Sequence, residues 1–174
     1  LAVGNGQTIG NAATAVGNNI AVNNQGGPLE VRADQKNGAY IQARAVTTAD
    51  QFGSAVTTAY AVGNSTLAGQ FGEELVLDNR QFNTGADIDA IATSSGREGY
   101  DMTTQATAMG NAVTGFACSE CGGVMEVNNR QTNRSNVTAT TSTSVTGSNR
   151  SVSGTTTAVG NSATFYVTRA GEGG

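Results

Sequence analysis

The chain has no histidine and no tryptophan, a single proline (Pro28), and few aromatic or charged residues, at 5% and 13% of its 174 positions. Without histidine, the nucleophile–base pairs of serine and cysteine hydrolases cannot be assembled. Paired carboxylates do not recur in a pattern typical of general acid–base catalysis, and the glycine-rich segments lack the lysine of a phosphate-binding loop. We therefore expect a protein that is not an enzyme, with no catalytic residues, no cofactor and no metal site.

Basic residues and long apolar runs are scarce as well. The net charge is −4, with nine Lys and Arg against thirteen Asp and Glu, whereas nucleic-acid binding calls for a basic face. No apolar run reaches the roughly 18 residues that would indicate a transmembrane helix. The chain opens at Leu1 without a methionine, which is typical of a processed or truncated product. We expect neither a nucleic-acid partner nor a membrane span.

What the chain does contain is a repeat. Glutamine recurs at intervals of 46 and 50 residues, and a Gly-Asn pair recurs at intervals of 46, 47 and 50. A fixed period in this range is the signature of a repeat architecture. The recurring residues are Gln35, Gln81 and Gln131; Gly17, Gly63, Gly110 and Gly160; and Asn18, Asn64, Asn111 and Asn161.

The segments between these marks are typical of strands. Thr, Val and Ala alternate with period two, as in residues 136–145, and the apolar spacing of a helix is absent. Small alanines on the inner side suit a narrow coil whose walls lie close together. We therefore predict an all-β fold, a β-solenoid of about three and a half repeats.

The predicted boundaries follow the period. Residues 1–29 form an N-terminal half repeat, residues 30–75, 76–125 and 126–170 form three whole repeats, and residues 171–174 form a tail. Uncapped terminal strands favour stacking with another copy, and a non-closing contact makes a filament. We expect the half repeat to complete a coil with the C-terminal end of the next subunit.

The recurring amides have two interpretations. Stacked identical amides can hydrogen-bond along the stack as ladders, which we favour for the three glutamines. For the Gly-Asn pairs the alternative is a tight turn with positive φ, with ladder pairing in addition.

Cys118 and Cys121 are the only cysteines. They offer too few ligands for a structural zinc ion, so we predict a small disulfide in an exported loop; the alternative is a pair of free thiols in a cytosolic chain.

Two further patterns are weaker. Asp87 and Asp89 fall on one face of a strand and, with Asp78 or with Glu98 and Asp101, supply ligand types that suit Ca²⁺; a solvated strand edge is the favoured interpretation. The threonine-rich tract 138–144 is compatible with an ice-binding face, but the other repeats do not share it.

The motifs at residues 81–85 and 131–139 place Gln, Asn, Gly and Ala in an order that resembles bacterial surface-fibre and adhesin subunits, namely the curli subunits and the holdfast anchor proteins of stalked bacteria. The period here is about twice that of curli. The resemblance implies an extracellular, curli-like functional amyloid at the cell surface that polymerises head to tail with itself, meets other surface or matrix components, and serves adhesion in biofilms. The rivals are a non-polymerising stalk of a larger adhesin and, more remotely, an ice-binding or polysaccharide-active solenoid.

Overall fold

In a computed structural model, which describes residues 1–118 and 123–168, every regular element is a β-strand. The described part of the chain holds no helix that could cross a bilayer. The strands are β1 (Ala2–Gly26), β2 (Leu29–Asn37), β3 (Ile41–Gly72), β4 (Leu75–Asn83), β5 (Ile88–Cys118), β6 (Met125–Asn133), β7 (Val137–Val145) and β8 (Ser151–Thr168).

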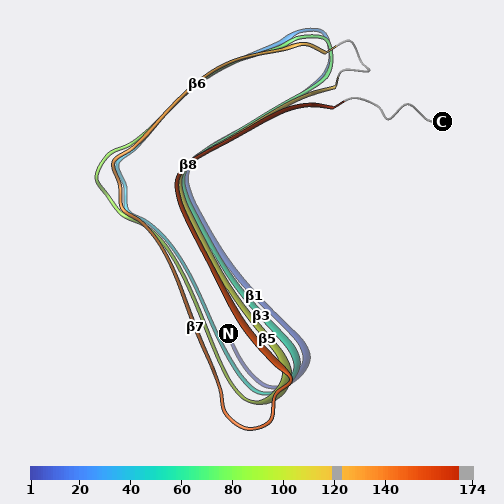
Figure 1. Ribbon diagram of the computed structural model, residues 1–174, viewed down its shortest axis with the longest axis vertical. Helices are drawn as coiled ribbons and strands as arrows, with labels where there is room; N and C mark the ends of the chain where they lie inside the picture. The colour runs from blue at the N-terminus through green and yellow to red at the C-terminus, as the bar shows by residue number, and fades with distance from the viewer. Residues whose placement is uncertain (119–122, 169–174) are drawn as a thin grey trace, which may run out of the picture.

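The strands wind into a solenoid. Figure 1 looks down the stack, so that successive coils overlie one another along one bent path. Each coil has a short strand, then a first arm that runs down to a tip, and a second arm that returns and bends outward. In β3 and β5 the two arms are one continuous strand, whereas in the last coil β7 is the first arm and β8 the second. The all-β solenoid that the sequence predicts is confirmed.

Every pairing between coils is parallel. β2, β4 and β6 form a three-stranded sheet, and the other strands form a five-stranded sheet in the order β1-β3-β5-β7, with β8 also on β5. The register pairs identical residues of successive coils, so that Gln35 lies beside Gln81 and Gln81 beside Gln131. A period of 46 to 50 residues is thus one full coil.

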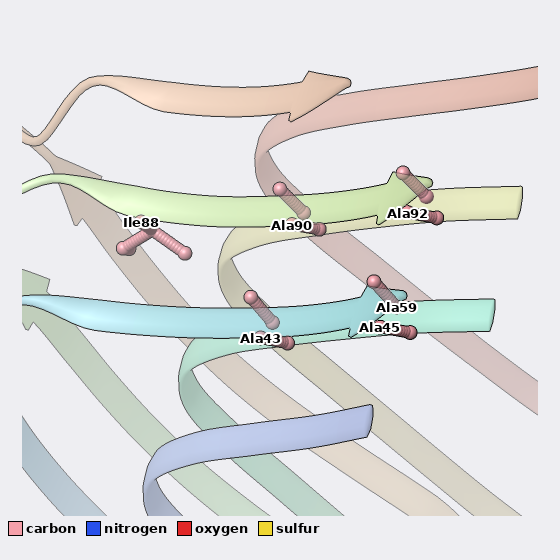
Figure 2. Packing of buried hydrophobic residues seen from close by; sticks show 9 residues of the cluster. Ala43, Ala45, Ala59, Ile88, Ala90 and Ala92 are labelled. Atoms are coloured by element: carbon pink, nitrogen blue, oxygen red, sulfur yellow. The ribbon is translucent and has the colours of Figure 1, made fainter. Parts of the chain in front are cut away.

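The alternation of the sequence creates the core. In the first arm of β3, Ala43 and Ala45 are buried while Arg44 between them points to solvent. Figure 2 shows alanine methyl groups of both arms meeting between the walls, with Ile88 as the one larger side chain among the labelled residues. Because alanine is small, the walls approach closely, and a chain poor in large apolar residues still forms a dry interior.

Larger apolar side chains fill the two ends of each coil. At the tip, Phe52 and Met102 pack with Ile9. Between the short strands and the outer part of the second arm, Leu75 and Leu77 are fully buried.

Strand register changes the expectation for residues 1–29. β1 stacks on the second arm of β3, with Thr8 against Ser54 and Gln25 against Phe71. β8 also occupies the second arm, so it does not supply the short strand and first arm that β1 lacks. β8 already belongs to the complete coil of β6, β7 and β8, so the expected completion of the N-terminal half coil by the C-terminal end of another copy does not fit this geometry.

Candidate functional site

The recurring amides gather at the bend of the coil, between the short strands and the second arms. Gln81 Nε2 donates to Gln35 Oε1 at 2.8 Å, and Gln131 Nε2 donates to Gln81 Oε1 at 2.8 Å. The three glutamines thus form a ladder that runs along the stack. Every axial bond in it points toward the N-terminal coil.

Each glutamine also bonds across the coil. Gln35, Gln81 and Gln131 donate to the carbonyl oxygens of Ser65, Ala112 and Ser162 on the facing arm, at 2.9, 2.9 and 3.0 Å. Gln35 and Gln81 are almost fully buried. A buried amide that bonds both along and across the stack fixes the separation of the two walls as well as their register.

The asparagines form a second ladder of opposite sense. Asn18 donates to Asn64 at 2.7 Å, Asn64 to Asn111 at 2.8 Å, and Asn111 to Asn161 at 2.7 Å. These bonds point toward the C-terminal coil. The two ladders therefore give the stack a defined polarity.

A third row of amides joins the second ladder, and the sequence analysis missed it. Asn83, at the end of β4, accepts from Asn64 at 3.0 Å and donates to Asn111 at 2.9 Å. Asn37 and Asn133 hold the equivalent register positions. The signal was present in the Gln-x-Asn spacing of all three repeats, because residues two apart on a strand share a face.

The turn interpretation of the Gly-Asn pairs is wrong. All four pairs lie inside strands, and none of Gly17, Gly63, Gly110 and Gly160 has a positive φ. At Gly17, Gly63 and Gly110 glycine is needed because neighbouring atoms approach closely. A Cβ on Gly63 would lie 2.6 Å from Asn83 Oδ1 and 2.6 Å from the Gly110 carbonyl oxygen. The third amide row fills the space that a side chain would take.

Gln70 is a further buried amide, although it has no counterpart in the other repeats. Its Nε2 donates to the Gly27 carbonyl oxygen at 2.6 Å, and its side chain is fully buried. Its register partners are Asn24 and Ala117, so it belongs to no ladder. A lone amide of this kind leaves no periodic signal in the sequence.

The ladders join successive coils of one chain along the solenoid axis. The family model of holdfast attachment protein D matches residues 1–86 and 98–172. The chain belongs to the holdfast attachment protein D family. No curated protein and no solved structure matches it. Membership in this family implies a role in holdfast attachment and a cell-surface or extracellular location. The expected likeness to holdfast anchor proteins is thereby confirmed, and the likeness to curli stays a prediction.

Four of the acidic residues singled out by sequence, Asp78, Asp87, Asp89 and Asp101, accept hydrogen bonds from other side chains of the chain. Asp87 accepts from Asn136 Nδ2 at 3.0 Å, and Asp89 accepts from the Tyr40 hydroxyl at 2.7 Å. The bond to Asp89 raises the pKa of Tyr40. At the tip, hydrogen bonds from Arg150 lower the pKa of Asp101. No group of three metal-binding side chains occurs in residues 1–118 and 123–168.

The threonine tract lies at the surface. Along the threonine tract, residues 138, 140, 142 and 144 are exposed while those between them are half-buried, so the tract divides between two faces of β7. Cys118 ends β5, and Cys121 lies outside the described residues, so the disulfide stays a prediction.

Proposed function

We propose that the chain is a non-enzymatic structural subunit of an extracellular bacterial surface anchor, which polymerises end to end through stacked strands and serves adhesion within the biofilm matrix. The observation that carries the proposal is the polarity of the asparagine ladder. Within residues 1–118 and 123–168, Asn18 Oδ1 has no hydrogen-bond donor and Asn161 Nδ2 has no acceptor. The two ends of the ladder thus complement each other.

The register specifies the contact. Residues 8–25 of β1 and residues 151–168 of β8 occupy the same part of the second arm at opposite ends of the stack. Placing β1 of one copy on β8 of another continues the parallel sheet. Asn161 Nδ2 then faces Asn18 Oδ1 with the same sense as the three bonds already in the ladder. In this contact only the second arms of the two copies pair. The short strands and the first arms of the two copies do not pair.

The proposed contact between copies has the same parallel pairing as the contacts between coils within one chain. Parallel, in-register strands with stacked amides and dry interiors are the features of stable cross-β assemblies.

Electron microscopy of the purified protein tests the proposal with a matched pair of variants. Asn161→Asp keeps the oxygen that accepts from Asn111 but loses the donor for the next copy. Asn19→Asp makes the same charge change on an exposed, outward-facing position of β1. We expect filaments from the parent and from Asn19→Asp. For Asn161→Asp, the concentration needed for filaments should rise about tenfold or more, since about 1–3 kcal/mol of contact energy is lost.

The second candidate function is a stalk segment of a larger adhesin, in which the same coils act as a rod. Single rods from the parent protein at all concentrations would favour the stalk and reject polymerisation. Equal effects of the two aspartate variants would reject the asparagine ladder as the contact.

A further inference from the structure

The second arms carry no charged residue. They comprise residues 9–25 of β1, 55–71 of β3, 102–118 of β5 and 152–168 of β8, which pair in register. All nine Lys and Arg and all thirteen Asp and Glu of the chain lie outside these four ranges. In Figure 1 the four arms overlie one another on the right-hand side of the stack. We call their solvent-facing surface the uncharged face.

The other sheet surfaces of the solenoid are charged. On β2 the four exposed side chains are Glu30, Arg32, Asp34 and Lys36. On the first arm of β3, Arg44 points to solvent. Charges on exposed sheet surfaces keep chains from associating. Because the second arms lack this protection while the short strands and first arms have it, the uncharged face has the character of a contact surface.

Aromatic side chains form a column across the uncharged face, near the outer end of the arms. The ring centre of Phe116 lies 5.1 Å from that of Phe71 and 5.8 Å from that of Tyr166, whose ring is stacked on it. Phe71 and Tyr166 are each 46% exposed, so the column is open to solvent. Val16 and Val56 are further exposed apolar residues of this face. Exposed aromatic residues without nearby charge are typical of the core of a protein–protein interface.

Uncharged polar side chains are also arranged in rows. Thr14, Tyr60, Thr107 and Thr157 hold one register position in four adjacent strands. Such rows repeat at the strand spacing of about 4.8 Å. Rows of stacked side chains interdigitate with those of a second sheet that has the same spacing, and the contact is dry. The uncharged face therefore fits a partner that is itself an uncharged, stacked sheet, and this chain has such a sheet.

We propose that the outer part of the uncharged face binds the same surface of a second copy, so that two solenoids lie side by side. We call this part the aromatic limb; it lies beyond the bend and comprises residues 18–25, 64–71, 111–118 and 161–168. A charged partner would lose hydration here without gaining an opposite charge. A second copy brings no charge to bury, and its rows have the same spacing.

The area of the aromatic limb sets the strength of this contact. Eight residues along each of four strands cover about 26 Å by 19 Å, or roughly 500 Å² per copy. Two copies bury about 1,000 Å² in total, the lower limit for a specific interface. Pairing of single rods is therefore weak, whereas in an end-to-end stack the same area repeats with every copy. The inference goes beyond end-to-end stacking and uses a different surface.

Scanning transmission electron microscopy of unstained filaments tests the inference, because it measures mass per length. One stack carries one chain of 17.5 kDa per four strands, or per about 19 Å. We expect parent filaments to have twice the mass per length of one stack. Thr164→Lys places a charge on the aromatic limb and should halve the parent value. Thr140→Lys makes the same change at an exposed position of β7 and should leave it unchanged.

Phe71→Ser is a second variant of the aromatic limb, on β3 and away from the end-to-end contact. It removes one end of the aromatic column and should also halve the mass per length. Circular dichroism shows whether each variant keeps its strands. Single stacks in the parent would overturn the inference, and so would equal values for Thr164→Lys and Thr140→Lys. Flotation of the parent with phosphatidylcholine vesicles, lost in Phe71→Ser, would assign the limb to a membrane and overturn it as well.

The same surface is tested in single rods if the parent forms no filaments. Sedimentation equilibrium at about 1 mM should then show a dimer in the parent, which Thr164→Lys weakens about tenfold and Thr140→Lys does not. A parent that stays monomeric would contradict lateral pairing. Filaments that are single stacks reject this inference while the proposed function stands, and rods that pair without forming filaments do the reverse.

Discussion

Replacing Gln81 with leucine is expected to lower the free energy of unfolding by about 2–6 kcal/mol. The side chain is 1% exposed and bonds to Gln35, Thr66, Ala112 and Gln131. Leucine fills a similar volume but removes the side-chain donor to the Ala112 carbonyl and leaves one N–H of Gln131 without its partner. Each buried polar group left unpaired costs about 1–3 kcal/mol. Urea denaturation followed by circular dichroism measures the loss.

Gln105→Leu is the matched control. Gln105 lies on β5 and is exposed, and its side chain has no hydrogen-bond partner among the described residues. Its replacement should change the free energy of unfolding by no more than about 0.5 kcal/mol. A loss for Gln81→Leu that does not exceed the loss for Gln105→Leu would show that the buried ladder contributes nothing to stability.

Gly63→Ala is the second substitution with a large expected effect, again about 2–6 kcal/mol. The added methyl would meet the Asn83 amide and the Gly110 carbonyl oxygen, each at 2.6 Å. Overpacking costs about 1–3 kcal/mol, and displacing the Asn83 amide from Asn64 and Asn111 adds a comparable amount. A thermal melt followed by circular dichroism should show a large drop in the midpoint.

Gly10→Ala tests whether the destabilisation expected for Gly63→Ala comes from the close approach of neighbouring atoms to Gly63. Gly10 also lies within a strand, but no atom lies within 4 Å of where its Cβ would be. Alanine there should leave the midpoint unchanged or raise it slightly, since it reduces the freedom of the unfolded chain. Equal destabilisation by the two alanines would mean that the strand, and not the third amide row, dictates glycine at position 63.

The sequence predicted that the coils stack, because identical residues recur at the positions that pair between adjacent coils. When Gln35, Gln81 and Gln131 recur with one period and the coils are parallel, the three side chains must lie one above another. Period-two alternation then decides which residues face the core, as Ala43 and Arg44 show. These features depend only on spacing along the chain, which a single sequence contains.

What the sequence did not reveal depends on contacts between distant residues. Gly-Asn is typical of turns, and nothing near Gly63 in the chain signals that Asn83 occupies its side-chain space. The opposite senses of the two ladders are likewise not visible in the spacing of identical residues.

X-ray diffraction from aligned filaments of the purified protein tests whether the coils of successive copies form one continuous stack. If coils of successive copies continue one parallel stack, the strands lie across the filament axis at the spacing found within each copy. Stacked coils should give a meridional reflection at about 4.8 Å, along the filament axis. Filaments without that reflection, or with it on the equator, would contradict the account, because the coils would then not be stacked end to end.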